Sequence, residues 1–294
     1  MNFTGTIWRP PYEAWSALLQ VTAGCTHHKC KFCTLYEDLP FKFRMSPIGE
    51  VENDLKELSI ISPNALRLFL TGANPFVLST EKLKTIARLS KQYLPKLTNI
   101  GCFARITDIT PKSIEELKEL RAIGYNRLTI GVETGDDAAL SFMNKGYTSN
   151  DILVQCQKLE KANIDYNIFY LTGIYGDGKS EIGVENTVKI FNQLQPKIIG
   201  ASMLTVFETS QLFKEIQLGN WREESEVEKL QELRLLIKKL EINTHFSVLG
   251  ASNAFQFQGK LPSEKQKMLD YIDKIIDKYT EEQLKYYRDN LKSL

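Results

Sequence analysis

The order of apolar and polar positions predicts short strands alternating with helices along most of the chain. The expected strands lie at 17–22, 65–72, 97–104, 125–133, 165–173 and 197–207. They are nearly all apolar, as expected when both faces of a parallel sheet are covered. The expected helices lie at 46–61, 79–94, 110–124, 136–143, 149–162 and 180–194. This alternation predicts an α/β fold of parallel units, either a doubly wound sheet or a partial barrel.

Several helix boundaries carry their own local signals. Ser46 is expected to cap a helix whose first helical residue is Pro47. Ser79 or Thr80 is expected to cap the next helix, and Gly124 to close the third. These signals support helices between the strands.

The pattern changes after about residue 208. A long amphipathic helix is expected over 223–242, a last strand over 243–250, a loop over 251–266, and charged helical sequence beyond. We therefore expect a core over 1–207 and a mainly helical extension over 208–294 that packs on it.

Composition and charge narrow the class of protein. The chain has 37 basic and 36 acidic residues and a net charge of +1, so charge favours neither nucleic acid nor an anionic membrane as partner. No apolar stretch is long enough for a spanning helix, and the N-terminal residues do not resemble a signal peptide. The expected location is cytoplasmic. Five cysteines, three of them crowded together, favour reduced thiols and a metal centre.

The unusual residue clusters all follow the ends of expected strands. The cysteine loop follows the first strand, and "TGANP", "FAR", "VETGDD" and "LTGIYGDG" follow the second to the fifth. In parallel α/β architectures the chemistry lies at the carboxyl ends of the strands. The coincidence favours an enzyme.

The cysteine loop has the spacing Cys25-x4-Cys30-x2-Cys33. Zinc could take these thiolates with His27 or His28, but the second half of a usual zinc pattern is missing. The expected compartment disfavours a disulfide.

A plant-type ferredoxin cluster would need Cys102 or Cys156 as a distant fourth ligand, and both residues read as part of the core. Three thiolates without a fourth partner favour a four-iron cluster with one open iron. An open metal position is where a substrate or cosubstrate can bind.

At this point the chain resembles the radical SAM (S-adenosylmethionine) superfamily. Its hallmark is three closely spaced cysteines after the first strand with an aromatic residue before the last, here Phe32. The usual family spacing is three and then two residues, so this loop is one residue longer. "GCTHHKCKFC" resembles a variant among uncharacterised members. The resemblance extends from "RPPYEAWS" to "GKLPSEK".

The resemblance implies a partial (β/α)6 barrel similar to a TIM barrel, with a 4Fe–4S cluster and S-adenosylmethionine as cofactors. Cys25, Cys30 and Cys33 would be the iron ligands. The open iron would bind the amino and carboxylate groups of SAM. One electron, from a donor of flavodoxin or ferredoxin type, would release a 5′-deoxyadenosyl radical that abstracts hydrogen from a substrate.

The resemblance also assigns SAM contacts after successive strands. Gly72, Ala73 and Asn74 match the turn that binds the methionine amino group, although Asn74 stands where the family often has Glu. Arg105 matches a residue near the carboxylate, and Glu133 an acid that binds the ribose hydroxyls.

Lys145, the turn at Gly173 and the segment from Leu204 to Phe207 take roles from the same resemblance, whereas the lid proposed for 250–262 rests on its polar and aromatic composition. Lys145 is a candidate for the same pocket as Glu133. Gly173 opens a turn that contacts adenine, and the segment from Leu204 to Phe207 would complete the adenine site. The loop over 250–262 is a candidate lid.

The leading function is thus a radical SAM oxidoreductase of unidentified substrate, with nucleic acid and membrane not expected as partners. An enzyme acting on a tetrapyrrole or RNA is the alternative within the class. A non-catalytic iron–sulfur or zinc-binding scaffold or redox sensor is the alternative outside it. His27 and His28 are expected to pack or hydrogen-bond around the cluster, and His245 to be structural.

Overall fold

The computed structural model describes residues 1–290 and divides the chain into two compact units. The first unit consists of Met1–His28, Leu35–Gly131 and Gln155–Tyr166. The second consists of Lys29–Thr34, Val132–Val154 and, of the described residues, those from Asn167 onward. The cysteine loop therefore contributes residues to both units.

Eight strands form a mainly parallel sheet. Their order is β1-β4-β5-β6-β7-β8-β9-β10. The pairs β1–β4, β4–β5, β5–β6, β7–β8 and β8–β9 are parallel, and β9–β10 is antiparallel. The α/β class expected from the sequence is confirmed.

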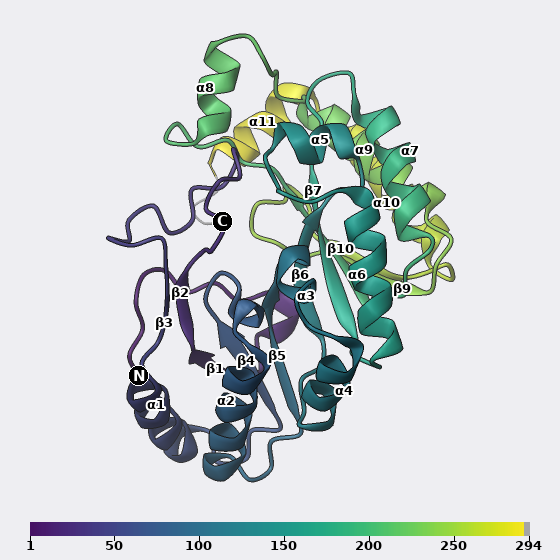
Figure 1. The fold of residues 1–294 in the computed structure, drawn as a ribbon. Helices are drawn as coiled ribbons and strands as arrows, with labels where there is room; N and C mark the ends of the chain where they lie inside the picture. Colours follow the sequence, from purple (N-terminus) through teal and green to yellow (C-terminus); the bar gives the residue numbers. More distant parts are fainter. Residues whose placement is uncertain (291–294) are drawn as a thin grey trace. The chain divides into compact units, whose positions relative to one another are not determined.

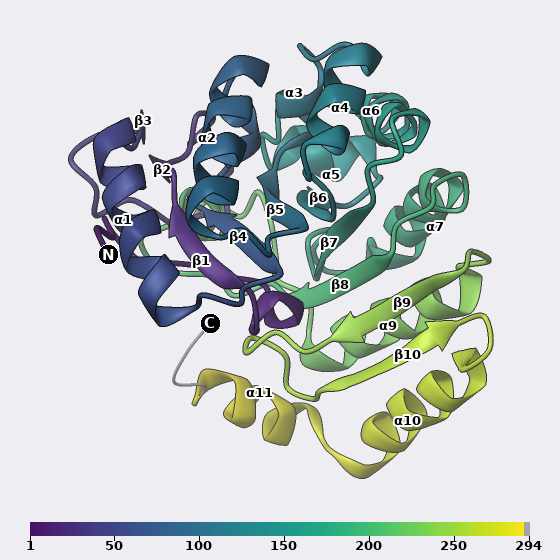
Figure 2. The same cartoon turned by 90° about the horizontal axis from the view of Figure 1, so that it is seen from below.

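The first unit contains the strands at the start of this sheet and the helices that cover them. Its strands are β1 (Ala17–Gln20), β4 (Arg67–Thr71), β5 (Asn99–Ala104) and most of β6 (Leu128–Glu133), with a separate antiparallel pair of β2 (Thr22–Gly24) and β3 (Phe43–Met45). Its helices are η1 (Pro11–Glu13), α1 (Ile48–Ile61), η2 (Pro75–Val77), α2 (Thr80–Tyr93), α3 (Ile106–Ile109), α4 (Ile114–Ala122) and part of α6 (Ser149–Lys161). Figure 1 and Figure 2 show α1 beside α2. The apolar residues of β4 and β5 are buried except the partly exposed Phe103, which places the core along these strands.

The second unit contains nearly all of β7 (Tyr166–Thr172), then β8 (Ile198–Met203), β9 (Thr244–Val248) and β10 (Phe257–Leu261). Its helices are α5 (Asp137–Phe142), α7 (Ser180–Phe191), α8 (Gln211–Gln217), α9 (Glu226–Lys239), α10 (Lys265–Lys278) and α11 (Glu281–Asp289). Helix α9 packs against α7, α10 and α11. Figure 2 shows α10 and α11 following β10.

The six predicted strands correspond to β1, β4, β5, β6, β7 and β8, and the predicted last strand corresponds to β9. Ser79 caps α2 by accepting a hydrogen bond from the Lys82 N–H, and Gly124 has a φ of +112° just after α4. The division into 1–207 and 208–294 stays a prediction.

Two predictions of local structure were wrong. The segment 251–266 is not all loop, because Phe257–Leu261 forms β10, antiparallel to β9, with Gly259 opposite Phe246. Cross-strand pairing outweighed the polar, loop-like composition of this segment. Helix α1 begins at Ile48, with Pro47 at the cap position. Ser46 does not cap it, because the Pro47 carbonyl accepts the first helical hydrogen bond, from the Val51 N–H at 3.1 Å.

Among residues 1–290, no helix is both long and apolar enough to cross a membrane.

Candidate functional site

The cysteine loop begins directly after β2. Gly24 ends that strand with a φ of +75°, and a Cβ atom there would overlap the Lys42 carbonyl, so the chain can turn into the loop only with glycine. Cys25, Cys30 and Cys33 are partly exposed and form no disulfide. The Cys33 N–H donates to the Cys30 carbonyl at 3.1 Å, which closes a tight turn between these two cysteines.

Cys102 and Cys156 differ from these three in their surroundings. Both have no exposed surface, and burial raises the pKa of each thiol well above its usual range. Iron and zinc bind the thiolate, and burial among apolar groups disfavours that form. The distant fourth ligand that a plant-type ferredoxin cluster needs is therefore not favoured at either position.

Within residues 1–290, no group of three or more His, Cys, Asp or Glu side chains is arranged to hold a single metal ion. The cysteines of a four-iron cluster bind separate irons, so their sulfurs need not converge on one point. Three partly exposed cysteines on one loop, none in a disulfide, fit such a cluster in the chemistry of their donor atoms.

In the first unit, the segment after β4 forms a turn that only glycine can begin. Gly72 has a φ of +119°, and a Cβ atom there would overlap the side-chain and carbonyl oxygens of Thr22. Ala73 is half-buried and Asn74 is fully buried. The backbone of this turn can therefore come close to a neighbouring group without an intervening side chain.

Asn74 ties this turn to two other segments of the first unit. Its Nδ2 donates to Thr26 Oγ1 at 2.7 Å and to the two carboxylate oxygens of Asp108 at 3.1 and 3.2 Å. Its Oδ1 accepts from the Thr26 N–H at 3.3 Å. Thr26 follows Cys25 in the chain, so Asn74 holds the start of the cysteine loop.

Arg105 follows β5 at the cap position of α3, and Asp108 belongs to the same cap. The Arg105 N–H donates to Asp108 Oδ2 at 2.8 Å, and the guanidinium donates to Thr107 Oγ1 at 3.0 Å. Burial raises the pKa of the Asp108 carboxyl to about 6, although the hydrogen bonds from Arg105 and Asn74 act in the opposite direction. Lys112 Nζ donates to the Phe76 carbonyl (2.7 Å) and the Asp108 carbonyl (3.1 Å), and burial lowers its pKa.

In the second unit, Lys145 joins the cysteine loop to the end of β6. Its Nζ lies 3.2 Å from Glu133 Oε1 and 5.5 Å from the ring centre of Phe32. Lys145 is 4% exposed, so its charge is shielded from water and held by an acid and by aromatic rings, Tyr147 included. Glu133 has a φ of +68°, an uncommon conformation for a residue with a side chain and one that occurs at functional sites.

Gly173 begins the turn after β7, and Glu232 of α9 holds it. The Gly173 N–H donates to Glu232 Oε2 at 2.8 Å, and the Tyr170 hydroxyl donates to Oε1 at 2.6 Å. Burial raises the pKa of Glu232 to about 7. Gly173 has a φ of +88°, and a Cβ atom would lie 3.2 Å from Lys229 Cε. The end of β8 is bonded to the end of β7, because the Leu204 N–H donates to the Thr172 carbonyl at 2.9 Å.

The structure thus joins several predicted residues within each unit. In the first unit Asn74 contacts the residue after Cys25 and the cap that contains Arg105, and in the second Lys145 joins Phe32 to Glu133. Sequence reasoning missed Asp108 and Glu232. The position of Asp108, three residues after Arg105 at a helix start, is a capping signal that could have found it. Glu232 lies within a long amphipathic helix and carries no such signal.

His28, His245 and the 250–262 segment lie in different surroundings. His28 has a φ of +46° in the cysteine loop, and His245 Nε2 lies 3.0 Å from Gln258 Oε1 across β9 and β10. Asn253 is buried and bonds the backbone of β8. Part of the predicted lid is therefore a strand and a buried loop; a covering role for its remaining residues stays a prediction.

The chain matches the family model described as the radical SAM superfamily over residues 19–187. It is 24% identical over 144 residues to the heme chaperone HemW of Bacillus subtilis, covering 47% of this chain and 37% of that protein. It is 24% identical over 197 residues to the tRNA-2-methylthio-N(6)-dimethylallyladenosine synthase of Methylacidiphilum infernorum, covering 61% of this chain and 39% of that protein. The chain spans about two fifths of the length of these relatives.

Solved radical SAM structures have the same fold. The methyltransferase TsrM from Kitasatospora setae, with cobalamin and a [4Fe-4S] cluster bound, has a TM-score of 0.57 and 19% identity over 69% of this chain and 39% of its own. Coproporphyrinogen III oxidase (HemN) from Escherichia coli has a TM-score of 0.56 and 18% identity over 76% of this chain and 51% of its own. The resemblance to these barrel-like enzymes supports the predicted fold.

The expected cofactors, a 4Fe–4S cluster and S-adenosylmethionine, are those that the family uses. TsrM has also been solved with a SAM analogue bound. The family match covers more than half of the chain and includes the cysteine loop, and the thiols of that loop, which form no disulfide, suit iron. The chain therefore belongs to the radical SAM superfamily.

Proposed function

We propose that the chain is an enzyme that cleaves S-adenosylmethionine reductively and uses the resulting radical on a substrate. The observation that carries the proposal is the set of three partly exposed cysteines, none in a disulfide, within the segment that the family model matches. We assign Cys25, Cys30 and Cys33 as the iron ligands. When bound, the cluster supplies one electron for cleavage of the sulfur–carbon bond of SAM. A flavodoxin- or ferredoxin-type donor is the proposed source of that electron.

The chain's own residues would bind and orient SAM. The backbone at Gly72 and Ala73 would meet the methionine amino group, and the proposal is supported by the turn that Gly72 begins and by the half-buried position of Ala73. Arg105 carries a planar guanidinium suited to a carboxylate. Glu133, oriented by Lys145, would accept hydrogen bonds from the ribose hydroxyls, and Gly173 would let the backbone approach adenine.

Asn74 would act through its neighbours as well as through its amide oxygen. Its amide hydrogens bind Thr26 and Asp108, so it supports the cysteine loop. Asp108, which accepts from Asn74, would supply a carboxylate next to the position where the family often has Glu and this chain has Asn74. Phe32 would pack beside the cluster and place Lys145 by a cation–π contact.

The test is anaerobic reconstitution of the protein with iron and sulfide, followed by SAM and dithionite and an assay for 5′-deoxyadenosine. We expect product from the parent and none from Cys30→Ala. Cys156→Ala is the matched control, because the same change at a buried thiol outside the loop should keep the iron and the product. Equal iron content in Cys30→Ala and the parent would contradict the assignment of the ligands.

A second candidate function is binding of a tetrapyrrole without SAM cleavage, which the similarity to a heme chaperone favours. The reconstituted parent would then bind heme, followed by its absorption spectrum, while forming no 5′-deoxyadenosine. An enzyme that acts on a tetrapyrrole or RNA would instead form 5′-deoxyadenosine faster when its substrate is added. The similarity to a tRNA-modifying enzyme makes tRNA a second substrate to add in that assay.

A further inference from the structure

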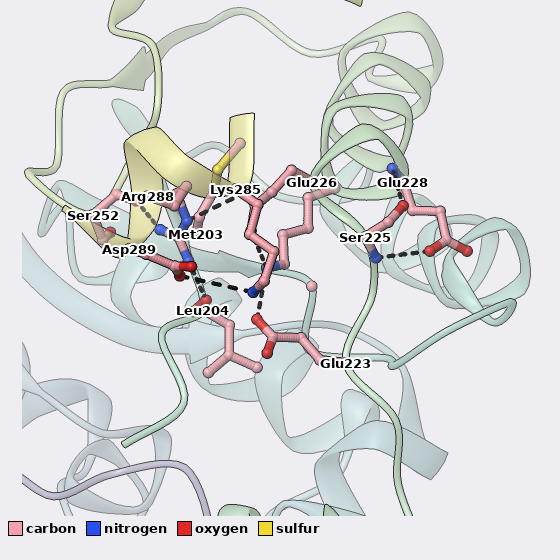
Figure 3. A network of polar contacts seen from close by, with 12 residues as sticks. Met203, Leu204, Glu223, Ser225, Glu226, Glu228, Ser252, Lys285, Arg288 and Asp289 are labelled. Carbon is pink, nitrogen blue, oxygen red and sulfur yellow. Dashed lines mark hydrogen bonds and ion pairs between the residues drawn. The ribbon is translucent and has the colours of Figure 1, made fainter. Parts of the chain in front are cut away.

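The end of β8 is bound by a residue of the C-terminal helix. Arg288 of α11 donates from one terminal nitrogen to the Leu204 carbonyl at 2.6 Å and from the other to the Ser252 carbonyl. Its Nε lies 3.3 Å from Glu226 Oε2, and only 6% of its side chain is exposed. Figure 3 shows the guanidinium pointing toward Leu204 and Ser252. One side chain thus holds two separate backbone segments and an acid.

The same stretch of backbone has a second set of fixed partners. Asn253 Oδ1 accepts from the Met203 N–H at 2.9 Å, and Asn253 Nδ2 donates to the Ala201 carbonyl at 3.1 Å. Arg288 binds the carbonyl of Ser252, the residue before Asn253. Arg288 therefore positions Leu204 directly and holds the loop that carries Asn253.

Arg288 is itself anchored by buried charges on α9. Glu226, its acidic partner, also accepts from Lys229 Nζ at 2.8 Å, and Lys229 is fully buried and bonded to Glu223 at 2.7 Å. Glu281, at the start of α11, accepts from the N–H groups of Glu226 and Val227 at 2.8 and 2.9 Å. These contacts fix α11 on the N-terminal end of α9 at two points.

The location of these contacts favours a role in ligand binding in addition to a role in the core. Leu204 is the first residue after β8, and in α/β sheets ligands bind outside the carboxyl ends of the strands. A backbone that must contact a planar ring needs a fixed orientation, and loosening it costs affinity even where the chain stays folded. A guanidinium suits the task, since its rigid fork reaches two carbonyls and a carboxylate together, whereas a lysine ammonium is a single point charge.

We propose that Arg288 is a positioning residue for the adenine of SAM, which makes α11 part of the cofactor site. The inference rests on the proposed function and on the expectation, implied by the family resemblance, that the segment from Leu204 to Phe207 contacts adenine. Arg288 does not touch the cofactor; it holds the backbone that does. Loss of Arg288 should therefore weaken the binding of ligands that carry adenosine and leave the cluster in place.

The experiment measures dissociation constants for the reconstituted full-length protein with three ligands, SAM, S-adenosylhomocysteine and methionine. Arg288→Lys and Arg288→Gln are compared with the parent and with Lys285→Gln. Lys285 lies on the same helix, is 63% exposed in its side chain and pairs at 3.7 Å with Asp289, so it is the matched control. Iron content and melting temperature are measured for each variant.

We expect Arg288→Lys to bind SAM and S-adenosylhomocysteine about tenfold more weakly, with iron content and methionine binding close to those of the parent. Arg288→Gln should show the same selectivity, and Lys285→Gln should match the parent. In 5′-deoxyadenosine formation the change should appear in KM for SAM rather than in kcat.

Two results with the variants would overturn the inference. If folded Arg288→Lys binds SAM as the parent does, the bond to Leu204 does not position the cofactor. If SAM and methionine weaken equally, Arg288 acts on the whole structure and not on the adenine segment. If Arg288→Gln loses iron or has a lowered melting temperature, its SAM affinity reflects lost folding. The comparison of Arg288→Lys with the parent then provides the test. A parent that binds no SAM would contradict the proposed function as well, whereas binding without cleavage would contradict that function alone.

Discussion

Lys145 Nζ and Glu133 Oε1 lie 3.2 Å apart, and side-chain exposure is only 5% for the lysine and 16% for the glutamate. Removing one member of a shielded ion pair leaves the other charge without its partner, which costs more than the pair contributes while intact. The pair also includes the acid proposed to bind the ribose of SAM. It therefore links stability to the candidate site.

We predict that Lys145→Met lowers the free energy of unfolding by about 2 kcal/mol, because Glu133 keeps its charge in a shielded position. Glu133→Gln should cost less, since an amide needs no countercharge. The double variant should lose less stability than the sum of the single changes, by about 1 kcal/mol in a double-mutant cycle. Urea unfolding measures all four proteins, and strict additivity would show that the pair carries no coupling.

Gly72→Ala should be strongly destabilising. The new Cβ atom would overlap Thr22 backbone and side-chain atoms, and a φ of +119° is strained for alanine. We expect a loss of about 3 kcal/mol or more in the free energy of unfolding. Gly49→Ala is the control, because Gly49 lies in α1 with nothing within 4 Å of a new Cβ atom, and there alanine should stabilise by up to about 1 kcal/mol. Equal effects at the two sites would refute the packing argument.

The raised pKa of Asp108 predicts a pH dependence of stability. Its pKa is about 6 in the folded chain against 3.8 as the ordinary value, so between these pH values the folded state holds more protons than the unfolded state. The contribution of Asp108 to stability therefore falls as the pH rises from about 4 to about 6 and then stays level.

The measurement compares parent and Asp108→Asn by urea unfolding at pH values across that window. The parent should lose about 2–3 kcal/mol relative to the variant, since each unit of pKa difference corresponds to about 1.4 kcal/mol. An asparagine cannot ionise, so the stability of the variant lacks this pH-dependent contribution. A stability difference that does not change with pH would show that Asp108 titrates normally.

Glu232→Gln should loosen the turn after β7. The Tyr170 hydroxyl and the Gly173 N–H each donate to one carboxylate oxygen, and an amide offers only one acceptor. The Tyr170 hydroxyl would then have to turn and accept from the amide nitrogen, and both bonds would lose the charge of the acceptor. We expect a loss of about 1–3 kcal/mol and weaker binding of SAM. Glu241→Gln, at an exposed glutamate just beyond the same helix, should have little effect. Parent-like stability and SAM affinity in Glu232→Gln would argue against this bracing role.

The strands were predictable because they are short apolar runs bounded by turn residues, and the helices because their apolar faces repeat and several have clear caps. Strand β10 was not, since "FQGKL" alternates over only five residues within a polar segment, and its pairing with β9 depends on a neighbour supplied by the fold. Helix α1 starts one residue later than predicted, because Pro47 and not Ser46 supplies the first helical carbonyl acceptor, which residue type alone does not reveal.

The sequence by itself determined the α/β class, the cysteine loop and the glycines at the strand ends, since each depends on residue type and spacing over a few positions. Only the tertiary structure decided which side chains support those positions. Asn74 meets Asp108, Glu232 meets Gly173, and Arg288 meets Leu204 across separations of 34, 59 and 84 residues. Such contacts form when folding buries polar groups that must then find partners, and no local pattern records which partner each will find.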